Sequence, residues 1–561
     1  MIEFRSYGEN KFAVEGPFTE ISALRSRVNN QYPAAELQGI QEGFTVDSEA
    51  LVSFLANVMD HDFEFNLPER LNHLVEIRRL EVTAIAEFRS PIDNLEGIGI
   101  WADILMPHQA EAVAQLVIDN LPGAALFDEQ GVGKTLTALA AFDILFKKKA
   151  INRAIVVSPS GGFPAWRTDV DKFLPANYRF AQVEGRKDSA LISVSNQILL
   201  TSFDSVKALL PDLRLYASAG RTLLIIDESF FAKNSEAQRT RALAQLRKEV
   251  ARCFVLCGTP TPQSPLDLVS QMNLADRGIT FQGFLPSGDS VEDFHQIEMR
   301  ASYAPIIRRT KEEVLPDLPG KQFSIIEADL KPHQLALYEQ ILSELVLYLR
   351  TVDRTMFERE VQTYLQKRMA LTQVSISPSL LGQPDTDSGK YEMVSELLQK
   401  HFEQSARSVI IWCSFTTAIN DLKAKLEKYS PLVLDGRVHS AEEKYQIVQA
   451  FQEAREHRVL IANPKSASTS LTLTAANRSI YLDIPWQAAY LMQSIDRIHR
   501  TGQTSAEVFI DFIISKNTVD IKDYERAKLK IDSQAKLLGD PSPPLLSYDE
   551  AVAELGLADR G

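Results

Sequence analysis

The sequence predicts an α/β protein with two parallel-sheet lobes, helical insertions and a small N-terminal α+β unit. Two series of apolar runs indicate the lobes: RAIVVSPS, QILLTSF, TLLIIDES and CFVLCGTP come first, and SVIIWCSF, RVLIANP, RSIYLDIP and VFIDFII follow. Continuous β-branched and leucine runs that alternate with helical patterns are typical of buried parallel strands. A glycine-rich loop, GVGKT, joins an apolar run to a helical one. These observations predict an open α/β sheet that binds a ligand at its edge.

The elements follow in order along the chain. The N-terminal unit reads as a strand (KFAVEGPF), an amphipathic helix (TEISALRSRV), a strand pair (AELQGIQEGFTV) and a second helix opened by Ser48. At the other end, PSPP predicts a linker, and the capping box of Ser547 and Glu550 predicts a short helix. The expected organisation is an accessory unit at 1–98, a first lobe at 99–315 with a helical insertion at 264–305, a helical linker or protrusion at 316–385, a second lobe at 386–540 ending in a brace helix, and a Pro-rich linker with a short helix at 541–561.

Composition predicts a globular protein that is not embedded in a membrane. The chain has 561 residues, of which 45% are hydrophobic and 24% charged, enough to bury a large core. Its start, MIEFRSYGENK, lacks the apolar region of a signal peptide. Cys253, Cys257 and Cys413 lie in apolar runs without metal spacing, which favours core packing in a reducing compartment. We expect a cytoplasmic protein, nucleoid-associated in a bacterium or nuclear in a eukaryote.

The net charge of −14 is unevenly distributed. Residues 1–100 carry a net charge of −9 and residues 541–561 a net charge of −3, so the 440 residues between them are close to neutral. Local basic patches on that middle part can still bind phosphates. The acidic N-terminal unit is a poor candidate for binding DNA, and we expect it to dock a protein or to inhibit the chain to which it belongs.

The loop FDEQGVGKT predicts a phosphate-binding site. Gly131 and Gly133 let backbone N–H groups converge on phosphates at the positive end of a helix. Lys134 supplies a point charge, and the Thr135 hydroxyl can ligate Mg²⁺. Asp128 stands where such loops usually begin with glycine. The expected ligands are therefore ATP and Mg²⁺.

Two further motifs supply the chemistry of hydrolysis. Asp227 and Glu228 follow the apolar run LLII, so they emerge at the carboxyl end of a strand, where one acid can hold the metal and the other can activate water. Arg497 and Arg500 are spaced i, i+3 in QSIDRIHR and are expected on one helix face. A guanidinium from the second lobe can neutralise charge developing on the γ-phosphate.

In this order, the motifs resemble those of the SWI/SNF-type, helicase-like ATPases of superfamily two, from about Leu105 to Asp540. The resemblance rests on MPHQ, FDEQGVGKT, SPSGGFPAWRTDVDKFLP, IIDESFFAKNS, LCGTP, IIRRTKEEVLPDLPGK, WCSFTTAINDL, NPKSASTSLTLTAA and QSIDRIHRTGQ. It implies two RecA-like lobes that share one ATP site. The N-terminal unit is also similar to the accessory unit of annealing helicases with a HepA-related domain.

The resemblance implies roles for individual residues. The nucleotide-binding set is Gln109, Gln130, Gly131, Val132, Gly133, Lys134 and Thr135. The catalytic set is Lys134, Asp227, Glu228, Arg497 and Arg500, with Thr135 and Asp227 on the metal. The residues expected to couple ATP to DNA are Gly258, Thr259, Gln493 and Gln503. The expected DNA contacts are Ser158, Thr201, Ser202, Ser414, Lys465 and Thr469.

Departures from the family pattern concern coupling. Phe230 replaces the histidine that links hydrolysis to the second lobe, and Phe cannot make a hydrogen bond. Ala467, Ser468 and Ser470 replace glycines in a loop expected to contact one DNA strand, which stiffens it.

The implied function is ATP-driven translocation on double-stranded DNA, through backbone contacts with little sequence preference, to remodel protein–DNA or branched-DNA structures. Two alternatives stay open. One is a strand-separating helicase, and the other is an ATP-controlled scaffold subunit of a larger complex. DNA repair, transcription recycling and antiviral defence are all compatible with the sequence.

Overall fold

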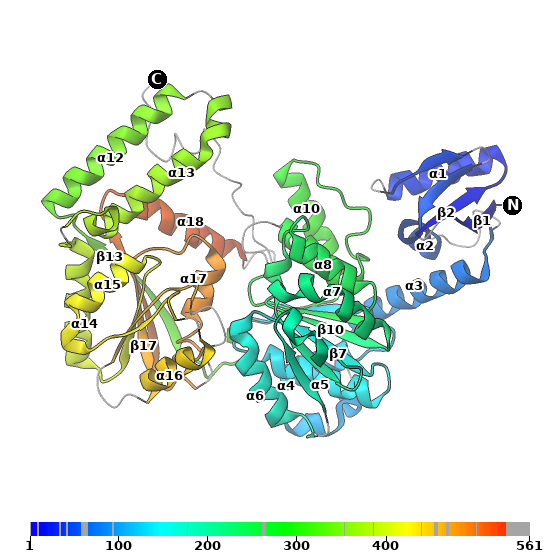
Figure 1. The fold of residues 1–561 in the computed structure, drawn as a ribbon, viewed down its shortest axis with the longest axis horizontal. Coiled ribbons are helices and arrows are strands. Elements are labelled where there is room, and N and C mark those ends of the chain that lie inside the picture. The colour runs from blue at the N-terminus through cyan, green and yellow to red at the C-terminus, as the bar shows by residue number, and fades with distance from the viewer. Residues whose placement is uncertain are drawn as a thin grey trace.

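The computed structural model describes residues 2–534, apart from 8–9, 33–34, 41–42, 58–64, 93–94, 177, 261–264, 353, 385, 439, 454–457, 467–470 and 501. The linker and short helix predicted at 541–561, with Ser547 and Glu550, lie outside the described residues. Three sheets, of five, seven and six strands, confirm the predicted α/β class (Figure 1). Among the described helices, none combines the length and the apolar character that a membrane span requires.

The N-terminal unit is a five-stranded sheet, in the order β3-β4-β2-β1-β5, with helices packed against it. Its pairs are antiparallel except β1 with β5. The elements are β1 (Ile2–Ser6), β2 (Lys11–Glu15), α1 (Phe18–Gln31), β3 (Gln38–Ile40), β4 (Gly43–Asp47), α2 (Ser48–Asn57), β5 (Phe65–Asn66) and α3 (Glu69–Phe88). The predicted strands and helices are present, and β1, β5 and α3 are additional.

The N-terminal unit is attached to the first lobe through α3 (Figure 1). Ala84, Ile85 and Phe88 from the end of α3 are buried in the core of the first lobe. Glu81 on the same helix pairs with Arg277 of that lobe at 2.7 Å. A Cβ on Gly283, which has φ +70°, would lie 2.1 Å from the carbonyl oxygen of Gln31 at the end of α1, so the two parts approach closely there.

The first lobe is a seven-stranded parallel sheet in the order β12-β6-β11-β10-β7-β9-β8. Its strands are β6 (Gly123–Leu126), β7 (Arg153–Val157), β8 (Phe180–Val183), β9 (Ile198–Thr201), β10 (Thr222–Asp227), β11 (Arg252–Leu256) and β12 (Ile306–Ile307). The helices η1 (Glu96–Asp103), α4 (Pro107–Leu116), α5 (Lys134–Lys147) and α6 (Phe163–Phe173) share the core on one face. The helices α7 (Phe203–Ser218), α8 (Gln238–Arg247), α9 (Leu266–Asp276) and α10 (Ser290–Ala301) pack on the other face.

The second lobe is a six-stranded parallel sheet in the order β13-β18-β17-β14-β16-β15. Its strands are β13 (Gly320–Ala328), β14 (Ser408–Trp412), β15 (Leu432–Leu434), β16 (Val459–Ala462), β17 (Ala476–Tyr481) and β18 (Glu507–Ser515). The helices α14 (Gly389–Gln404) and α15 (Thr416–Lys425) cover one face. The other core includes side chains of α16 (Ala441–Gln452), α17 (Ala488–Ile495) and α18 (Val519–Gln534).

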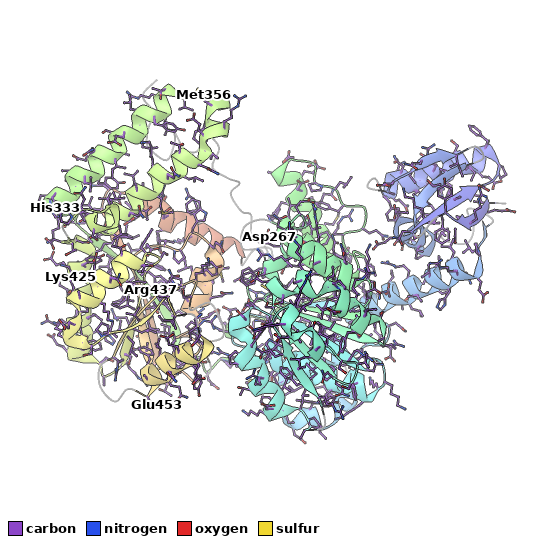
Figure 2. All side chains as sticks on the ribbon, in the orientation of Figure 1. Asp267, His333, Met356, Lys425, Arg437 and Glu453 are labelled. Atoms are coloured by element: carbon purple, nitrogen blue, oxygen red, sulfur yellow. The ribbon has the colours of Figure 1, made fainter. Side chains whose placement is uncertain are left out.

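Residues 316–385 differ from the prediction of a helical linker. The segment begins with β13, which pairs with β18 from Gly320 to Ala328 and forms an edge of the second sheet. Most of β13 is exposed, so it lacks the buried apolar run by which the other strands were recognised. The helical part is the hairpin of α12 (Pro332–Thr351) and α13 (Arg354–Ile376), which projects from the second lobe. Met356 lies at the tip of this hairpin, and His333 lies at the other end of α12 (Figure 2).

Candidate nucleotide site between the two lobes

Four loops meet at one edge of the first sheet. They follow β6, β11, β10 and β7, which are adjacent in the sheet, and they contain the glycine-rich loop, residues 257–260, the acidic pair and Ser158. Because the strands are parallel, their carboxyl ends lie together, which is where α/β sheets bind ligands. The second lobe contributes residues 493–500 to the same place, where Gln493 bonds Glu228, Asp496 pairs with Lys311 and Arg500 lies beside Gly131.

The glycine-rich loop has the backbone that a phosphate cradle needs. Gly131 (φ +95°) and Gly133 (φ +94°) are both left-handed, and Gly133 caps the N-terminus of α5. A Cβ on Gly133 would lie 2.0 Å from Nε2 of Gln109, so only glycine fits beside α4. Gln109 donates to the carbonyl of Val132 at 3.1 Å and thereby braces the loop. These contacts fit a loop held open for a phosphate chain.

The side chain of Lys134 folds back onto the glycine-rich loop. Its Nζ donates to the carbonyl oxygens of Asp128 at 2.7 Å and Glu129 at 3.1 Å. Burial lowers the pKa of Lys134, while the charges of Glu228 and Asp128 act in the opposite direction. A phosphate would replace neutral carbonyls with a charged partner, which makes a stronger, charge-assisted bond. The lysine therefore fits the role of phosphate ligand.

Asp227 is oriented by three donors from the first lobe. Its Oδ2 accepts from the Ser158 hydroxyl at 3.0 Å and from the indole N–H of Trp166 at 2.8 Å, and its Oδ1 accepts from the Glu228 amide. Burial raises the pKa of Asp227, and these hydrogen bonds oppose that change. An ionised carboxylate has about four acceptor positions, so room remains for one water of a metal ion. Trp166 was not predicted; the signal that could have found it is an indole donor in the helix after Ser158.

Glu228 is contacted from both lobes. Its backbone is left-handed, with φ 50° and ψ 52°, a conformation that is costly for a residue with a side chain. Its Oε1 accepts from Gln130 in the glycine-rich loop at 3.2 Å, and its Oε2 accepts from Gln493 of α17 at 3.3 Å. Burial first, and then the charge of Asp227, raise the pKa of Glu228 to about 7. Such a pKa suits a general base that works near neutral pH.

The two arginines do not lie on one helix face as predicted. The helix α17 ends at Ile495, and Arg497 and Arg500 lie in the turns that follow, where i to i+3 bonds such as Arg497 N–H to Ser494 O tighten the chain. They still reach the nucleotide site. The guanidinium of Arg497 is buried, donates to the carbonyl of Leu471 at 3.3 Å and lies close enough to Glu228 for its charge to lower the pKa of that acid.

Arg500 contacts the glycine-rich loop directly. A Cβ on Gly131 would lie 3.3 Å from Cγ of Arg500 and 3.5 Å from Cε of Lys311. Burial lowers the pKa of Arg500, while Asp496 and Asp169 act in the opposite direction. The aliphatic parts of two basic side chains from outside the loop thus lie beside Gly131, where phosphates are expected to bind.

Lys311 joins the two lobes and was not predicted. Its side chain is buried, and Nζ donates to Asp496 at 2.5 Å and to the carbonyl of His499 at 2.7 Å. Its backbone N–H donates to Glu129 of the glycine-rich loop at 2.6 Å. The residue therefore connects the phosphate loop with the segment that carries the arginines. The motif RRTK contained the signal, but only the fold supplies the partner.

The residues predicted to couple ATP to DNA take different positions. Gly258 packs against Gln130, since a Cβ built on Gly258 would lie 2.8 Å from Oε1 of Gln130. Thr259, the next residue, is buried. Gln493 contacts Glu228 as described. Gln503 instead donates to the carbonyls of Ala476 and Ile498 within the second lobe, so it braces the arginine turns from behind.

Phe230 does not face the second lobe. Its ring is buried in the core of the first lobe and stacks on Phe231 with a centroid distance of 4.4 Å. The hydrogen bond from Gln493 to Glu228 links the second lobe to the acidic loop instead.

Several predicted DNA contacts need correction. The hydroxyls of Ser158 and Thr201 are buried, and they donate to Asp227 and to the carbonyl of Val183 respectively, so they cannot serve as phosphate donors in this conformation. Ser202 is buried as well and caps α7 by accepting from the Ser205 amide. The physical reason is that a hydroxyl at a strand end can turn inward to satisfy neighbouring backbone and carboxylate groups.

Of the candidates on the second lobe, Ser414 is half-buried, and its backbone N–H already donates to Oδ1 of Asp483 at 2.8 Å. Lys465 is exposed, and its N–H donates to Asn463. Asn463 also donates to the carbonyl of Ser414 at 2.9 Å, which ties the two loops together. Thr469, with Ala467, Ser468 and Ser470, lies outside the described residues.

The residues of this site are suited to bind a Mg²⁺ ion that enters together with a nucleotide. Within the described ranges, no group of three or more His, Cys, Asp or Glu side chains could hold a metal ion unaided. Mg²⁺ is typically held by one or two protein groups together with substrate phosphates and water. Thr135 at the start of α5 and Asp227 would supply that small protein share.

Comparisons with known proteins identify two domains in this chain. A model of the SNF2-related domain matches residues 108–380, and a model of the helicase conserved C-terminal domain matches residues 389–502. An uncharacterized ATP-dependent helicase of Mycoplasma genitalium is 27% identical over 462 residues, which cover 79% of this chain and 42% of that protein. The SWI/SNF-related matrix-associated actin-dependent regulator of chromatin subfamily A-like protein 1 of Xenopus laevis is 27% identical over 458 residues, covering 77% of this chain and 45% of that protein.

Among solved structures, the Sulfolobus solfataricus SWI2/SNF2 ATPase core in complex with dsDNA is 23% identical and covers 80% of this chain and 94% of that one, with a TM-score of 0.36. This chain spans less than half the length of the two curated relatives. The two domain models match in the order expected for the two lobes and together cover most of the sequence. The chain belongs to the SNF2-related, SWI/SNF-type family of helicase-like ATPases.

Proposed function

We propose that this chain is an ATP-dependent double-stranded DNA translocase that uses DNA-stimulated ATP hydrolysis to remodel protein–DNA or branched-DNA structures. One observation carries the proposal: the carboxylate of Glu228 accepts from Gln130 in the first lobe and from Gln493 in the second. A base held from both sides can respond to the relative position of the lobes. Hydrolysis and movement of the lobes can therefore be linked.

The first lobe provides the hydrolytic groups. Lys134 and the glycine-rich loop would bind the phosphates of ATP, and Thr135 and Asp227 would hold Mg²⁺, which supplies positive charge to the transferring phosphoryl group. Glu228, with its pKa near 7, would orient the attacking water and accept its proton. Gln109 holds the loop in place through Val132.

The second lobe completes the site electrostatically. Arg497 lies beside Glu228, and Arg500 lies against Gly131. Charge that develops on the γ-phosphate would be neutralised from this side only when the lobes are close, an effect worth about 10³–10⁵ in rate for comparable arginines. Opening and closing of the lobes then gives each of them an alternating hold on DNA.

The DNA contact would use backbone phosphates. Ser414 and Lys465 lie in linked loops at the carboxyl edge of the second sheet, and Lys465 is exposed. Phosphate contacts fix position without reading sequence, and they weaken steeply with salt. The acidic N-terminal unit remains a candidate for binding a protein partner.

The test compares ATP hydrolysis by the wild type, Lys134→Ala and Glu228→Gln, each with and without duplex DNA. We expect duplex to raise the wild-type rate and both substitutions to abolish that rate. Displacement of a third strand from a triplex would report translocation, and displacement of one strand of a forked duplex would report a strand-separating helicase instead. The proposal fails if Lys134→Ala or Glu228→Gln retains DNA-stimulated hydrolysis.

A scaffold subunit controlled by ATP is the second candidate, and Phe230 in place of histidine is the observation that favours it. The same assay separates the two. A scaffold would bind nucleotide and DNA, but its rate of phosphate release would not rise with DNA.

A further inference from the structure

Ser229 and Gln271 form a buried polar contact directly behind the acidic pair. Both side chains are fully buried, and the Ser229 hydroxyl donates to Oε1 of Gln271 at 2.6 Å. The amide of Gln271 donates to the carbonyls of Pro260 at 2.5 Å and Asp267 at 2.8 Å. The amide orientation follows from chemistry, because only the NH₂ group can donate to two carbonyls. One side chain of α9 thus bridges the residue after Glu228 and the loop after β11.

These contacts complete a closed ring around the nucleotide site. From Glu228 the ring runs through Gln130, which bonds its carboxylate, to Gly258, which packs against Gln130. It then follows the chain to Pro260 and returns through Gln271 and Ser229 to Glu228. The ring joins the glycine-rich loop, the acidic loop and the 258–260 loop.

The same helix supports the acidic loop at further points. Ser270 donates to the carbonyl of Ala232 at 2.8 Å, and Asp267 pairs with Lys233 at 3.8 Å. These contacts hold the turn η4 (Ser229–Ala232) but do not touch the 258–260 loop. Gln271 differs from these two residues in that its hydrogen bonds reach both Pro260 and Ser229.

We infer that Gln271 is a positioning residue that couples the 258–260 loop to Glu228, so that DNA-dependent movement of this loop sets the position of the base. The inference rests on the proposed function and deepens it. It also gives a route for coupling in a chain whose Phe230 is packed into the core and makes no polar bond to the second lobe. The route runs within the first lobe, behind the acids.

The test uses Gln271→Leu, Gln271→Glu and Ser229→Ala in the full chain, with Ser270→Ala as the matched control on the same helix. Gln271→Leu removes the hydrogen bonds to both Ser229 and Pro260. Gln271→Glu removes the bond to Pro260, because a carboxylate cannot donate, and Ser229→Ala removes the bond between positions 229 and 271. Each substitution should lower the ratio of the DNA-stimulated to the unstimulated hydrolysis rate by about tenfold, which is within the usual range of coupling between sites. Ser270→Ala should keep the wild-type ratio.

The double variant Ser229→Ala/Gln271→Leu guards against a simple loss of stability, because it leaves fewer buried polar groups without partners. If the residues act through one bridge, the double variant is no more impaired than either single variant. Additive losses would overturn the inference, and so would a folded Gln271→Leu with an unchanged ratio, or equal losses of both rates.

Hydrogen–deuterium exchange separates this inference from the proposed function. In the wild type, binding of a nonhydrolysable ATP analogue should change exchange in peptides that contain 229–233 and 256–260 together. In Gln271→Leu, the change should be confined to the first peptide. If the wild-type rate does not rise with DNA, the proposed function fails, and the exchange result still decides on the bridge. If exchange still changes in both peptides of Gln271→Leu, Gln271 does not act as the bridge.

Discussion

The side-chain amide of Gln493 donates to Oε2 of Glu228 across 3.3 Å, from the second lobe to the first. Gln130 holds the other carboxylate oxygen at 3.2 Å. Both donors are neutral amides, so they orient Glu228 without adding the positive charge that would strongly lower its pKa. The positive charge comes separately from Lys134 and Arg497. Orientation and charge are thus provided by different residues, and each can be tested by its own substitution.

The two arginines should respond differently to substitution. Arg500 lies against Gly131, so Arg500→Ala should lower the hydrolysis rate by about 10³ with a small change in melting temperature. Arg497 is fully buried, so Arg497→Ala should also destabilise the fold, by about 3 kcal/mol, through a cavity and an unpaired carbonyl at Leu471. Rates at saturating nucleotide and thermal unfolding measure the two effects.

Arg500→Lys serves as the control for charge. Lysine keeps the charge but lacks the planar guanidinium, so the rate should remain low. Normal hydrolysis by Arg500→Ala would show that Arg500 does not act on the phosphate.

The lobe-crossing ion pair of Lys311 and Asp496 should be sensitive to loss of one partner. Both side chains are buried, and Lys311→Met leaves Asp496 without its cation, which should cost about 3–5 kcal/mol of unfolding free energy. The double variant Lys311→Met/Asp496→Leu should recover much of that loss, because no buried charge remains unpaired. Denaturant unfolding of the single and double variants measures the coupling.

Lys331→Met is a matched control for that pair. Lys331 also lies 2.5 Å from a carboxylate, Glu392, but that pair is exposed and should contribute about 1 kcal/mol or less. Equal losses in Lys311→Met and Lys331→Met would contradict a special role for the buried pair.

The sequence predicted those parts of the site that depend on local spacing. Lys134 follows its glycines directly, and Glu228 follows Asp227 at the end of an apolar strand, so both positions were readable without a fold. The contacts of Trp166 with Asp227 and of Lys311 with Asp496 were not readable, because they join residues 61 and 185 positions apart. The sequence does not tell which way a side chain turns at a strand end, and Ser158 and Thr201 turned inward. The edge strand β13 was missed because it is mostly exposed.

His499 should make stability depend on pH. It is buried, with Nε2 at 2.9 Å from the carbonyl of Pro319, and burial lowers its pKa from 6.5 to about 4. Between these two values the unfolded chain binds the proton and the folded chain does not, so stability falls as pH falls from 6.5 towards 4. The full effect of such a shift is about 3 kcal/mol.

Unfolding free energies of the wild type and His499→Gln, measured across this range, test the prediction. Glutamine can still donate to Pro319 but does not titrate, so the variant should lose less stability on acidification. Carboxylates titrate in both proteins, and the difference between the two curves isolates the histidine. If the unfolding free energies of the two proteins change with pH in the same way, His499 is not a source of the pH dependence.

Restoring histidine at position 230 should not restore a link to the second lobe. The Phe230 ring is buried among Phe203, Phe231 and their neighbours and stacks on Phe231, so an imidazole there would enter an apolar core. We expect Phe230→His to lower stability by about 1–3 kcal/mol and to leave DNA stimulation of hydrolysis no higher than in the wild type. Phe230→Leu is the control, because it removes the ring without adding a polar group. If Phe230→His instead raises DNA stimulation several-fold over Phe230→Leu, the side chain at 230 must reach the second lobe during the cycle, and the coupling does not depend on Gln493 and Gln271 alone.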